Sequence, residues 1–124
     1  MNSECPFCNI AAGKIIASNE YCIAFHDGFP VSPGHTLIIP RRHVADFFDM
    51  TEAEISAMNT LLREVKKRLD SELHPDGYNI GVNVNAAAGQ SVFHVHMHFI
   101  PRYIGDTPNP KGGVRGVIPG KMKY

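Results

Sequence analysis

The sequence predicts a single domain of the α+β class. Five short segments bounded by Gly, Pro, Asn or Asp have the apolar runs or alternating apolar residues of β-strands. One much longer segment has apolar residues at spacings of three and four, the period of an amphipathic helix. A chain of 124 residues, 44% of them hydrophobic, can bury one core. We therefore assign residues 1–124 to one domain.

The charge balance excludes several classes of partner. Twelve Lys and Arg residues balance twelve Asp and Glu residues, which argues against broad binding to nucleic-acid backbones or membrane surfaces. No apolar run approaches the roughly 18 residues of a spanning helix, and residues 1–4 do not begin a signal peptide. We expect a cytoplasmic protein with neither a nucleic-acid nor a membrane partner.

The first half of the chain contains three predicted strands. Residues 14–18 and 21–27 form two of them, joined by a turn at Asn19-Glu20. Cys22 lies between strand formers and is expected in the core. Residues 35–40 form the third strand, whose apolar run Leu37-Ile38-Ile39 indicates a central place in the sheet.

His35, which opens this third strand, is interpreted as a hydrogen-bonded structural histidine, since a lone histidine is more often structural than catalytic.

The long helix begins with a capping box at Thr51-Glu52-Ala53-Glu54 and ends at His74-Pro75-Asp76-Gly77. Met58 and Leu61 could extend its apolar face to a partner chain. The stripe expected to pack on the sheet consists of Ile55, Met58, Leu62, Val65, Leu69 and Leu73.

Three histidines alternate with apolar residues within the segment 91–100. Alternation at period two predicts a strand with all three imidazoles on one face, about 6.5 Å apart at a rise of roughly 3.3 Å per residue. A fourth strand, 78–84, delivers Asn83 to the preceding loop, which ends in Gly89-Gln90-Ser91. Small residues, amides and a hydroxyl suit a loop that wraps an anion.

Two chemistries would use these histidines. A His-x-His pair can bind a catalytic metal ion, as in a metal-dependent hydrolase. Alternatively, a neutral imidazole can act as a nucleophile in transfer at phosphorus, with a neighbouring ring as proton donor. The amide and hydroxyl donors next to the histidines favour the second chemistry, because such donors suit phosphate oxygens.

The chain resembles the histidine triad (HIT) superfamily of nucleotide hydrolases and transferases. The family signature of three histidines separated by apolar residues reads here His94-Val95-His96-Met97-His98-Phe99-Ile100. Ile23-Ala24-Phe25-His26-Asp27 and Gly34-His35-Thr36-Leu37-Ile38-Ile39-Pro40-Arg41-Arg42-His43 are similar to other family segments, as are Asn83 and Gly89-Gln90-Ser91, so the resemblance covers about residues 5–103. It implies an antiparallel sheet of about five strands with one long and one short helix.

The resemblance also implies an activity. It implies hydrolysis at the α-phosphate of nucleoside phosphoramidates or dinucleoside polyphosphates through a nucleotidyl-histidine intermediate. His96 would be the nucleophile and His98 the proton donor, with His94 and Ser91 also catalytic. The substrate, a purine nucleotide or nucleotide conjugate, would be bound by Asp27 at the ribose, Phe25 at the base, and Asn83, Gly89, Gln90, Ser91 and His98.

Two alternatives stay open within this resemblance, and one feature departs from it. The chain could be a nucleotidyltransferase or phosphorylase of the same superfamily, or a nucleotide-binding adaptor without turnover. The segment 13–20 is shorter than in many relatives, where it adjoins the base pocket, which affects base preference. Similar proteins form homodimers, so a homodimer is expected here as well.

Cys5-Pro6-Phe7-Cys8 is half of a tetrahedral zinc site. Some bacterial relatives with this pair bind structural zinc, which implies His43 and His94 as the other ligands here. An unmetallated pair of thiols is the alternative. A thioredoxin-type pair is less favoured, because it should follow a strand and open a long helix.

Residues 104–124 form a tail rich in Gly and Pro that carries Lys111, Arg115, Lys121 and Lys123. Its composition favours a mobile segment. The alternative is that the tail folds over the site, as in some relatives, and contacts the leaving group.

Overall fold

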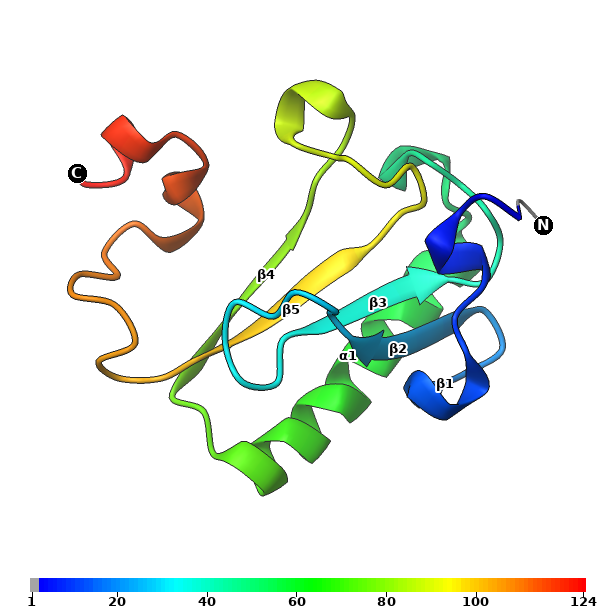
Figure 1. The fold of residues 1–124 in the computed structure, drawn as a ribbon, viewed down its shortest axis with the longest axis horizontal. Coiled ribbons are helices and arrows are strands. Elements are labelled where there is room, and N and C mark those ends of the chain that lie inside the picture. The colour runs from blue at the N-terminus through cyan, green and yellow to red at the C-terminus, as the bar shows by residue number, and fades with distance from the viewer. Residues whose placement is uncertain (1–2) are drawn as a thin grey trace.

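A computed structural model describes residues 3–124 as a five-stranded sheet with one long helix on one face (Figure 1). Met1 and Asn2, the start of the stretch in which we expect no signal peptide, lie outside the described residues. None of the helices within 3–124 combines the length and apolar character needed to span a bilayer. The elements are β1 Ile15–Ser18, β2 Cys22–His26, β3 Thr36–Pro40, α1 Glu52–Leu73, β4 Gly77–Val82 and β5 Met97–Arg102.

The sheet has the order β1-β2-β3-β5-β4, and every neighbouring pair is antiparallel. β3 is therefore central, as its apolar run predicts, and all five of its residues are buried. The crossover from β3 to β4 through α1 leaves room for β5 between them (Figure 1). This arrangement places the start of β5 beside the middle of the sheet.

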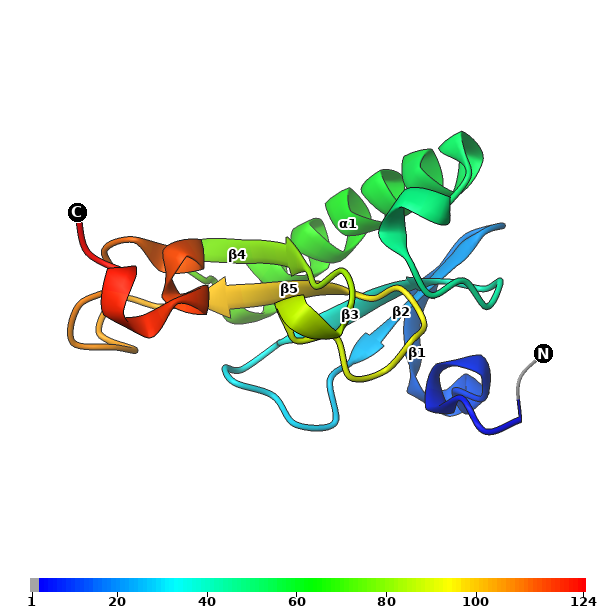
Figure 2. The same cartoon turned by 90° about the horizontal axis from the view of Figure 1, so that it is seen from above.

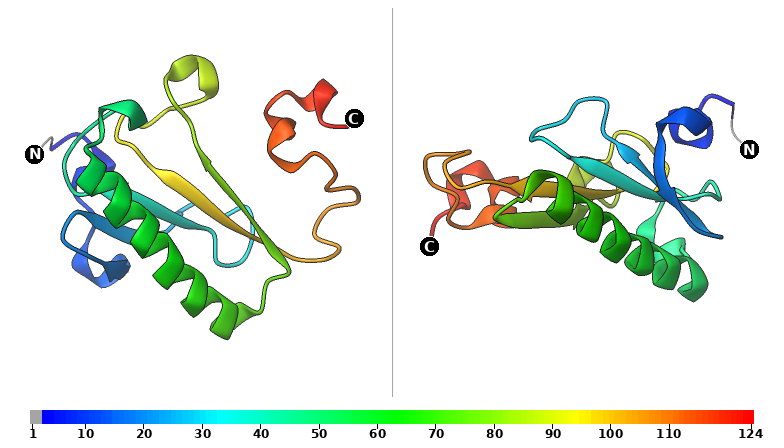
Figure 3. Two further views of the ribbon diagram at one scale, coloured as in Figure 1. Left: turned by 180° about the vertical axis from the view of Figure 1, so that it is seen from behind. Right: turned by 90° about the horizontal axis from the view of Figure 1, so that it is seen from below.

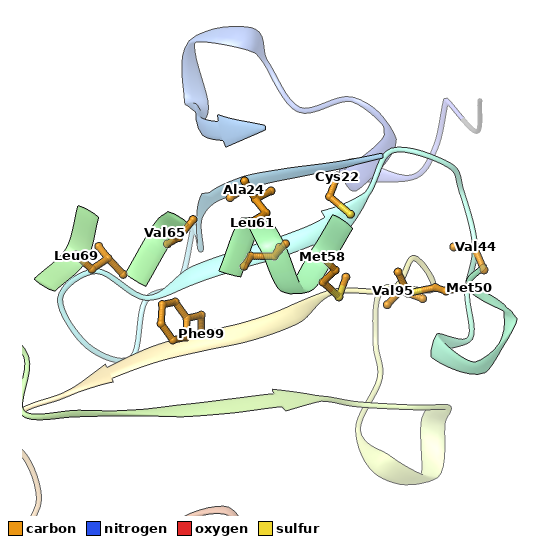
Figure 4. Packing of buried hydrophobic residues seen from close by; sticks show 11 residues of the cluster. Cys22, Ala24, Val44, Met50, Met58, Leu61, Val65, Leu69, Val95 and Phe99 are labelled. Carbon is orange, nitrogen blue, oxygen red and sulfur yellow. The ribbon is translucent and has the colours of Figure 1, made fainter. Parts of the chain in front are cut away.

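The helix packs on one face of the sheet and forms the main core (Figure 4). Leu61 and Met58 are 0% and 1% exposed, whereas Ile55 and Leu73 are 39% and 38% exposed. The expectation that Leu61 and Met58 could reach a partner chain is therefore wrong, because both side chains are enclosed between α1 and the sheet. Val65 and Leu69 complete the buried stripe.

A second, smaller apolar cluster lies on the opposite face of the sheet. It consists of Ile23, Phe25, Leu37 and Ile39, with Phe7, Ile10 and Ile15 packed against it. Figures 2 and 3 show the amino-terminal segment on this face and α1 on the other. His98 points to the same side as Leu37, since the two residues are directly paired across β5 and β3.

Polar contacts fix both ends of α1. The predicted capping box is present: Glu54 N donates to Thr51 Oγ1 at 3.1 Å, and Thr51 N donates to Glu54 Oε1 at 2.9 Å. The buried Glu54 carboxylate also accepts two hydrogen bonds from Arg42, which hold its pKa below the usual value. At the other end His74 adopts the left-handed conformation of a helix C-cap.

We expected one short helix besides α1. Residues 3–124 contain no second α-helix but six short 3-10 helices. Two of them, Gly113–Val117 and Pro119–Lys121, lie in the tail that composition favours as mobile. In this structure the tail folds back beside β4 (Figure 1). A Cβ added at Gly113 would lie 3.3 Å from the side-chain nitrogen of Asn79, so the tail meets β4 at this point.

The burial of Leu61 generates a stability prediction. Leu61→Ala should lower the free energy of unfolding by about 2–5 kcal/mol, because it removes a fully enclosed side chain and leaves a cavity. Urea denaturation followed by circular dichroism would measure the loss. Leu73→Ala is the matched control on the same helix and should cost less than about 1 kcal/mol. Equal, small losses in both variants would contradict this account of the core.

Candidate functional site

Only one of the three triad histidines lies in a β-strand. His98 lies in β5, but His94 and His96 precede that strand, which begins at Met97. The predicted strand from residue 91 is therefore wrong in its first six residues. The reason is that this stretch bonds to the loop after β3: Val95 N donates to Val44 O at 2.8 Å, and the Gln90 amide donates to Ala45 O at 2.8 Å.

The imidazoles nevertheless face the same side, as the alternation predicts. The ring of Phe7 lies 6.2 Å from that of His94 and 5.0 Å from that of His96, centroid to centroid. The rings of His96 and His98 are 5.2 Å apart, closer than the spacing of about 6.5 Å expected along a strand. Phe7 thus covers the edge of the triad.

His94 is fully buried, and its tautomer is fixed by the backbone. Its Nε2 lies 2.8 Å from the carbonyl oxygen of Pro40, which can only accept a hydrogen bond, so Nε2 carries the proton. Nδ1 then presents a lone pair to Cys5 Sγ at 3.5 Å and Cys8 Sγ at 3.6 Å. This is the tautomer that a metal ligand requires.

His96 has its tautomer set in the same way. Its Nδ1 donates to the carbonyl oxygen of His94 at 2.8 Å, which leaves a lone pair on Nε2. A backbone carbonyl, and not a flanking imidazole, therefore fixes this tautomer. An unprotonated Nε2 is the form in which imidazole acts as a nucleophile.

His98 is held by a chain of contacts that reaches the loop before β3. Val31 N donates to His35 Nδ1 at 3.2 Å, so the proton of His35 is on Nε2, which lies 3.0 Å from His98 Nδ1. His98 Nδ1 therefore accepts, and its own proton is on Nε2. Burial is the main cause that lowers the pKa of both His35 and His98.

The interpretation of His35 as a hydrogen-bonded histidine is confirmed. No local pattern indicates that its partner is His98, 63 residues away in the chain, so sequence analysis missed the role of His35 in orienting the triad.

Asp27 directly follows β2 and faces this pair of rings. Its Oδ2 lies 3.4 Å from His35 Nε2 and 3.9 Å from His98 Nδ1, while its Oδ1 accepts a hydrogen bond from Phe29 N at 2.9 Å. The carboxylate is close enough to stabilise a protonated His98. Its expected contact with a ribose stays a prediction.

The loop before the triad is braced by Gln90. Its Oε1 accepts from Asn85 N at 2.8 Å, and its Nε2 donates to the carbonyl oxygens of Ala45 and Val92. Both ends of the buried amide are engaged by backbone, so the structure assigns Gln90 a loop-bracing role where we expected a phosphate donor. Ser91 is exposed beside it.

Gly89 has φ of +94°, a conformation that favours glycine. A side chain there would approach the amide of Asn83, which lines a groove that also contains His98. The structure thus brings Asn83, Gly89 and His98 together, while a phosphate contact from any of them remains a prediction.

Phe25 is the expected base-contacting residue, and it lies in the apolar cluster on the same sheet face as His98. Its side chain is 5% exposed, and its ring lies edge-on to Phe7 at 5.6 Å. Phe7 in turn contacts His96. These two rings form an apolar wall next to the middle histidine, which is consistent with a slot for a base.

The four predicted zinc ligands converge. The ligand atoms of Cys5, Cys8, His43 and His94 all lie within 4.8 Å of one another, and Cys8 Sγ is 3.2 Å from His43 Nδ1. Bonds of about 2.0 and 2.3 Å to nitrogen and sulfur imply edges of roughly 3.3–3.8 Å in a tetrahedron. The donor set and its spacing therefore fit zinc.

The Cys-x-x-Cys pair leads into a short 3-10 helix, Pro6–Cys8. A thioredoxin-type pair would open a long helix, so the local structure disfavours that alternative.

Comparison with known proteins gives a consistent result. A model of the HIT domain matches residues 10–105. An uncharacterised HIT-like protein of Mycoplasma genitalium is 44% identical over 105 residues, 82% of this chain and 74% of that protein. A HIT family structure from Bacillus subtilis has a TM-score of 0.77 at 31% identity, covering 97% of this chain and 90% of that one.

A zinc-bound histidine triad family protein from Mycobacterium smegmatis has a TM-score of 0.75 at 32% identity and covers 92% of this chain and 90% of that one.

Some relatives are named for an activity. An adenylylsulfatase of Arabidopsis thaliana is 32% identical over 106 residues, 82% of this chain, and an AP-4-A phosphorylase of Mycobacterium tuberculosis is 29% identical over 85% of it. The chain spans 54% of the length of each of these two proteins. The diadenosine triphosphate hydrolase of Plasmodium falciparum has a TM-score of 0.75 at 27% identity, covering 81% of this chain and 68% of that one.

Proposed function

Because the chain belongs to the histidine triad (HIT) family, we propose that it is a nucleotide hydrolase. Its substrates are nucleoside phosphoramidates or dinucleoside polyphosphates, attacked at the α-phosphate. The observation that carries the proposal is the hydrogen bond from His96 Nδ1 to the His94 carbonyl, which leaves the Nε2 lone pair available. The relatives named as an adenylylsulfatase, an AP-4-A phosphorylase and a diadenosine triphosphate hydrolase support a reaction at a nucleotide phosphate.

The reaction has two steps. His96 Nε2 attacks phosphorus, the bond from phosphorus to the leaving group breaks, and the nucleotide is held on His96. Water then attacks phosphorus, the bond to His96 breaks, and the nucleoside monophosphate is released. In the first step the nucleophile is therefore an imidazole that the protein already holds in position. Direct hydrolysis would instead need a water molecule to be positioned for attack.

His98 handles the proton of the leaving group. An amine leaves with a proton from protonated His98, which regains one from the attacking water in the second step. Burial lowers the pKa of His98, so most molecules carry it neutral near pH 7. The Asp27 carboxylate partly offsets this effect and favours the protonated ring.

Ser91, Asn83, Asp27 and Phe25 bind the nucleotide in this proposal. The Ser91 hydroxyl and the Asn83 amide donate to the phosphate and the leaving atom. Asp27 accepts from the ribose hydroxyls, and Phe25 with Phe7 lines the slot for a purine base. A transferase or phosphorylase reaction is the second candidate, favoured by the AP-4-A phosphorylase relative. Added inorganic phosphate would yield a nucleoside diphosphate in that case.

A homodimer is part of the proposal. β4 is an edge strand whose outer hydrogen-bonding groups face no other strand among the described residues. Three exposed apolar side chains lie near this side of the molecule: Ile80 in β4, Ile55 in α1 and Phe48 in the 3-10 helix before α1. A second copy of the chain would cover both.

Zinc is proposed as a structural ion on Cys5, Cys8, His43 and His94. Thiolates reduce its Lewis acidity, and four protein ligands leave no position for water. The purified protein should carry about one zinc ion per chain, and Cys5→Ser with Cys8→Ser should lower the melting temperature while activity per folded molecule persists.

Metal analysis under thiol-protecting conditions measures the zinc content. Cys22→Ala is the matched control, since Cys22 is a buried cysteine outside the cluster, and it should retain the ion. A metal-free wild-type protein would refute the site, and loss of turnover at unchanged stability would reassign the ion to catalysis.

Asp27→Ala should weaken ribonucleotide binding by about one to two orders of magnitude, since a charge-assisted hydrogen bond contributes roughly 1.5–3 kcal/mol. Calorimetric binding of AMP and its 2′,3′-dideoxy analogue separates this role from the contacts of Asp27 with His35 and His98. The dideoxy analogue should lose little affinity. Asp27→Asn keeps an acceptor for Phe29 N and controls for the loop, and equal losses for both ligands would make Asp27 structural.

A covalent nucleotide should form on His96. Brief mixing with substrate labelled at the α-phosphate, an alkaline quench and peptide mapping should place the label there, because phosphorus–histidine bonds resist base. His98→Ala should slow label formation by roughly 10² to 10⁴ for an amine leaving group.

His96→Asn should abolish both label and turnover yet still bind AMP. His74→Asn is the control, since His74 lies at the helix C-cap, where asparagine is tolerated. Near-normal turnover by His96→Asn, or a label elsewhere, would favour direct attack by water. AMP binding without turnover of any activated derivative by the wild type would instead indicate an adaptor.

A further inference from the structure

The turn that contains Cys5 and Cys8 can close into a disulfide without any movement of the sheet. Cys8 N donates to the carbonyl oxygen of Cys5 at 3.2 Å, so the two residues are the ends of a four-residue turn. Such a turn keeps its end Cα atoms within about 7 Å, and a disulfide needs about 4.4–6.8 Å. The two sulfurs also belong to a group of ligand atoms that all lie within 4.8 Å of one another. Rotation of the two side chains and a small shift of the turn are enough to join them.

The pair is accessible to a small oxidant but not to a large one. Cys5 and Cys8 are 7% and 8% exposed and His94 is fully buried, whereas His43 is not buried. The cluster therefore opens to solvent along His43, whose Nδ1 lies 3.2 Å from Cys8 Sγ. Hydrogen peroxide, which is little larger than water, can approach Cys8 on this side. A disulfide of two tripeptides cannot reach a sulfur that is so deeply enclosed.

Cys22 does not compete for the oxidant. Its side chain is 0% exposed, and its Sγ lies 3.7 Å from the carbonyl oxygen of Glu54 in α1. Burial raises the pKa of the Cys22 thiol to about 11, so this thiol stays in the protonated, unreactive form at neutral pH. Cysteines that bind zinc do so as thiolates, the reactive form. Oxidation should therefore be confined to Cys5 and Cys8.

We propose that Cys5 and Cys8 are an oxidation site, at which a disulfide releases the zinc ion and weakens nucleotide binding. The inference rests on the zinc and nucleotide sites of the proposed function. One thiolate attacks the O–O bond of hydrogen peroxide, which gives a sulfenic acid and a hydroxide ion. The other thiolate attacks the sulfenic sulfur, the S–S bond forms and a second hydroxide ion leaves. His43 and His94 alone are too few ligands to retain the ion.

The disulfide would affect the triad through Phe7. This residue lies between the two cysteines in the chain, and its ring centroid is 5.0 Å from that of His96 and 5.6 Å from that of Phe25. Closing the turn redirects the Phe7 side chain and disturbs the wall of the base slot. His94 keeps its hydrogen bond to Pro40, because that bond uses Nε2 and not the nitrogen that faces the thiols. We therefore expect weaker AMP binding, with turnover at saturating substrate unchanged.

Treatment of the zinc-loaded protein with hydrogen peroxide tests the site. About one zinc ion per chain should pass to a chromogenic chelator as two thiols disappear. Peptide mapping should find a disulfide between Cys5 and Cys8 and a free thiol at Cys22. Glutathione disulfide at the same concentration should release little zinc. Dithiothreitol followed by added zinc should restore the starting state.

The affinity for AMP, measured by calorimetry, is the second readout. The oxidised protein should bind AMP about two- to tenfold more weakly than the reduced, zinc-loaded protein, the range expected for the loss of one aromatic contact. Cys22→Ala is the matched control and should release zinc at the wild-type rate. Cys8→His keeps four zinc ligands but has no second thiol, so peroxide should leave its zinc in place.

The outcomes separate this inference from the function on which it rests. Zinc retained by the wild type after peroxide treatment, or released with sulfinic acids in place of a disulfide, would overturn the oxidation site and leave the zinc site standing. A reduced protein without zinc would refute the zinc site and the release together. A disulfide that releases zinc at unchanged AMP affinity would refute the transmission through Phe7.

Discussion

The hydrogen bond from His94 Nε2 to the carbonyl oxygen of Pro40 is the contact on which the site depends. Pro40 ends the central strand, so this acceptor is held by the best-buried element of the sheet. The bond selects the tautomer that directs Nδ1 at the thiols. It also anchors His94, whose own carbonyl oxygen accepts the hydrogen bond from His96 Nδ1. A candidate metal site and a candidate nucleophile are thus oriented from one backbone atom.

The same short stretch connects the site to both faces of the sheet. Val95 and Phe99 point into the core under α1, where each is 1% exposed, while His98 points to the opposite face. Alternation along the chain therefore determines both the packing and the position of the histidines. A shift of one residue would turn the imidazoles into the core under α1 and the apolar side chains to the opposite face. The large core on the helix side makes such a shift costly.

The fold could be predicted from local patterns, and the site only in part. The capping box at Thr51 and the apolar run in β3 are local signals, and both predictions are confirmed. The start of β5 could not be predicted, because Gln90, His94 and Val95 bond to the end of β3 and the loop after it, 45–54 positions away in the chain. Periodicity also could not show that Leu61 is enclosed while Ile55 is exposed, since both lie near the edge of the apolar stripe. The partners of Gln90 and His35 depend on tertiary contacts in the same way.

Phe7 connects the candidate zinc site to the candidate base slot. Its ring touches Phe25 and His96, yet its backbone lies within the turn that joins Cys5 to Cys8. An ion held by the turn and a base stacked beside Phe7 would therefore share the entropic cost of ordering one segment. The ligand that binds first orders the segment, so the second ligand binds at a lower entropic cost. By thermodynamic linkage, each ligand raises the affinity of the other by the same factor. A zinc ion and a nucleotide would then raise each other's binding affinity without direct contact, while turnover at saturating nucleotide would not depend on the ion.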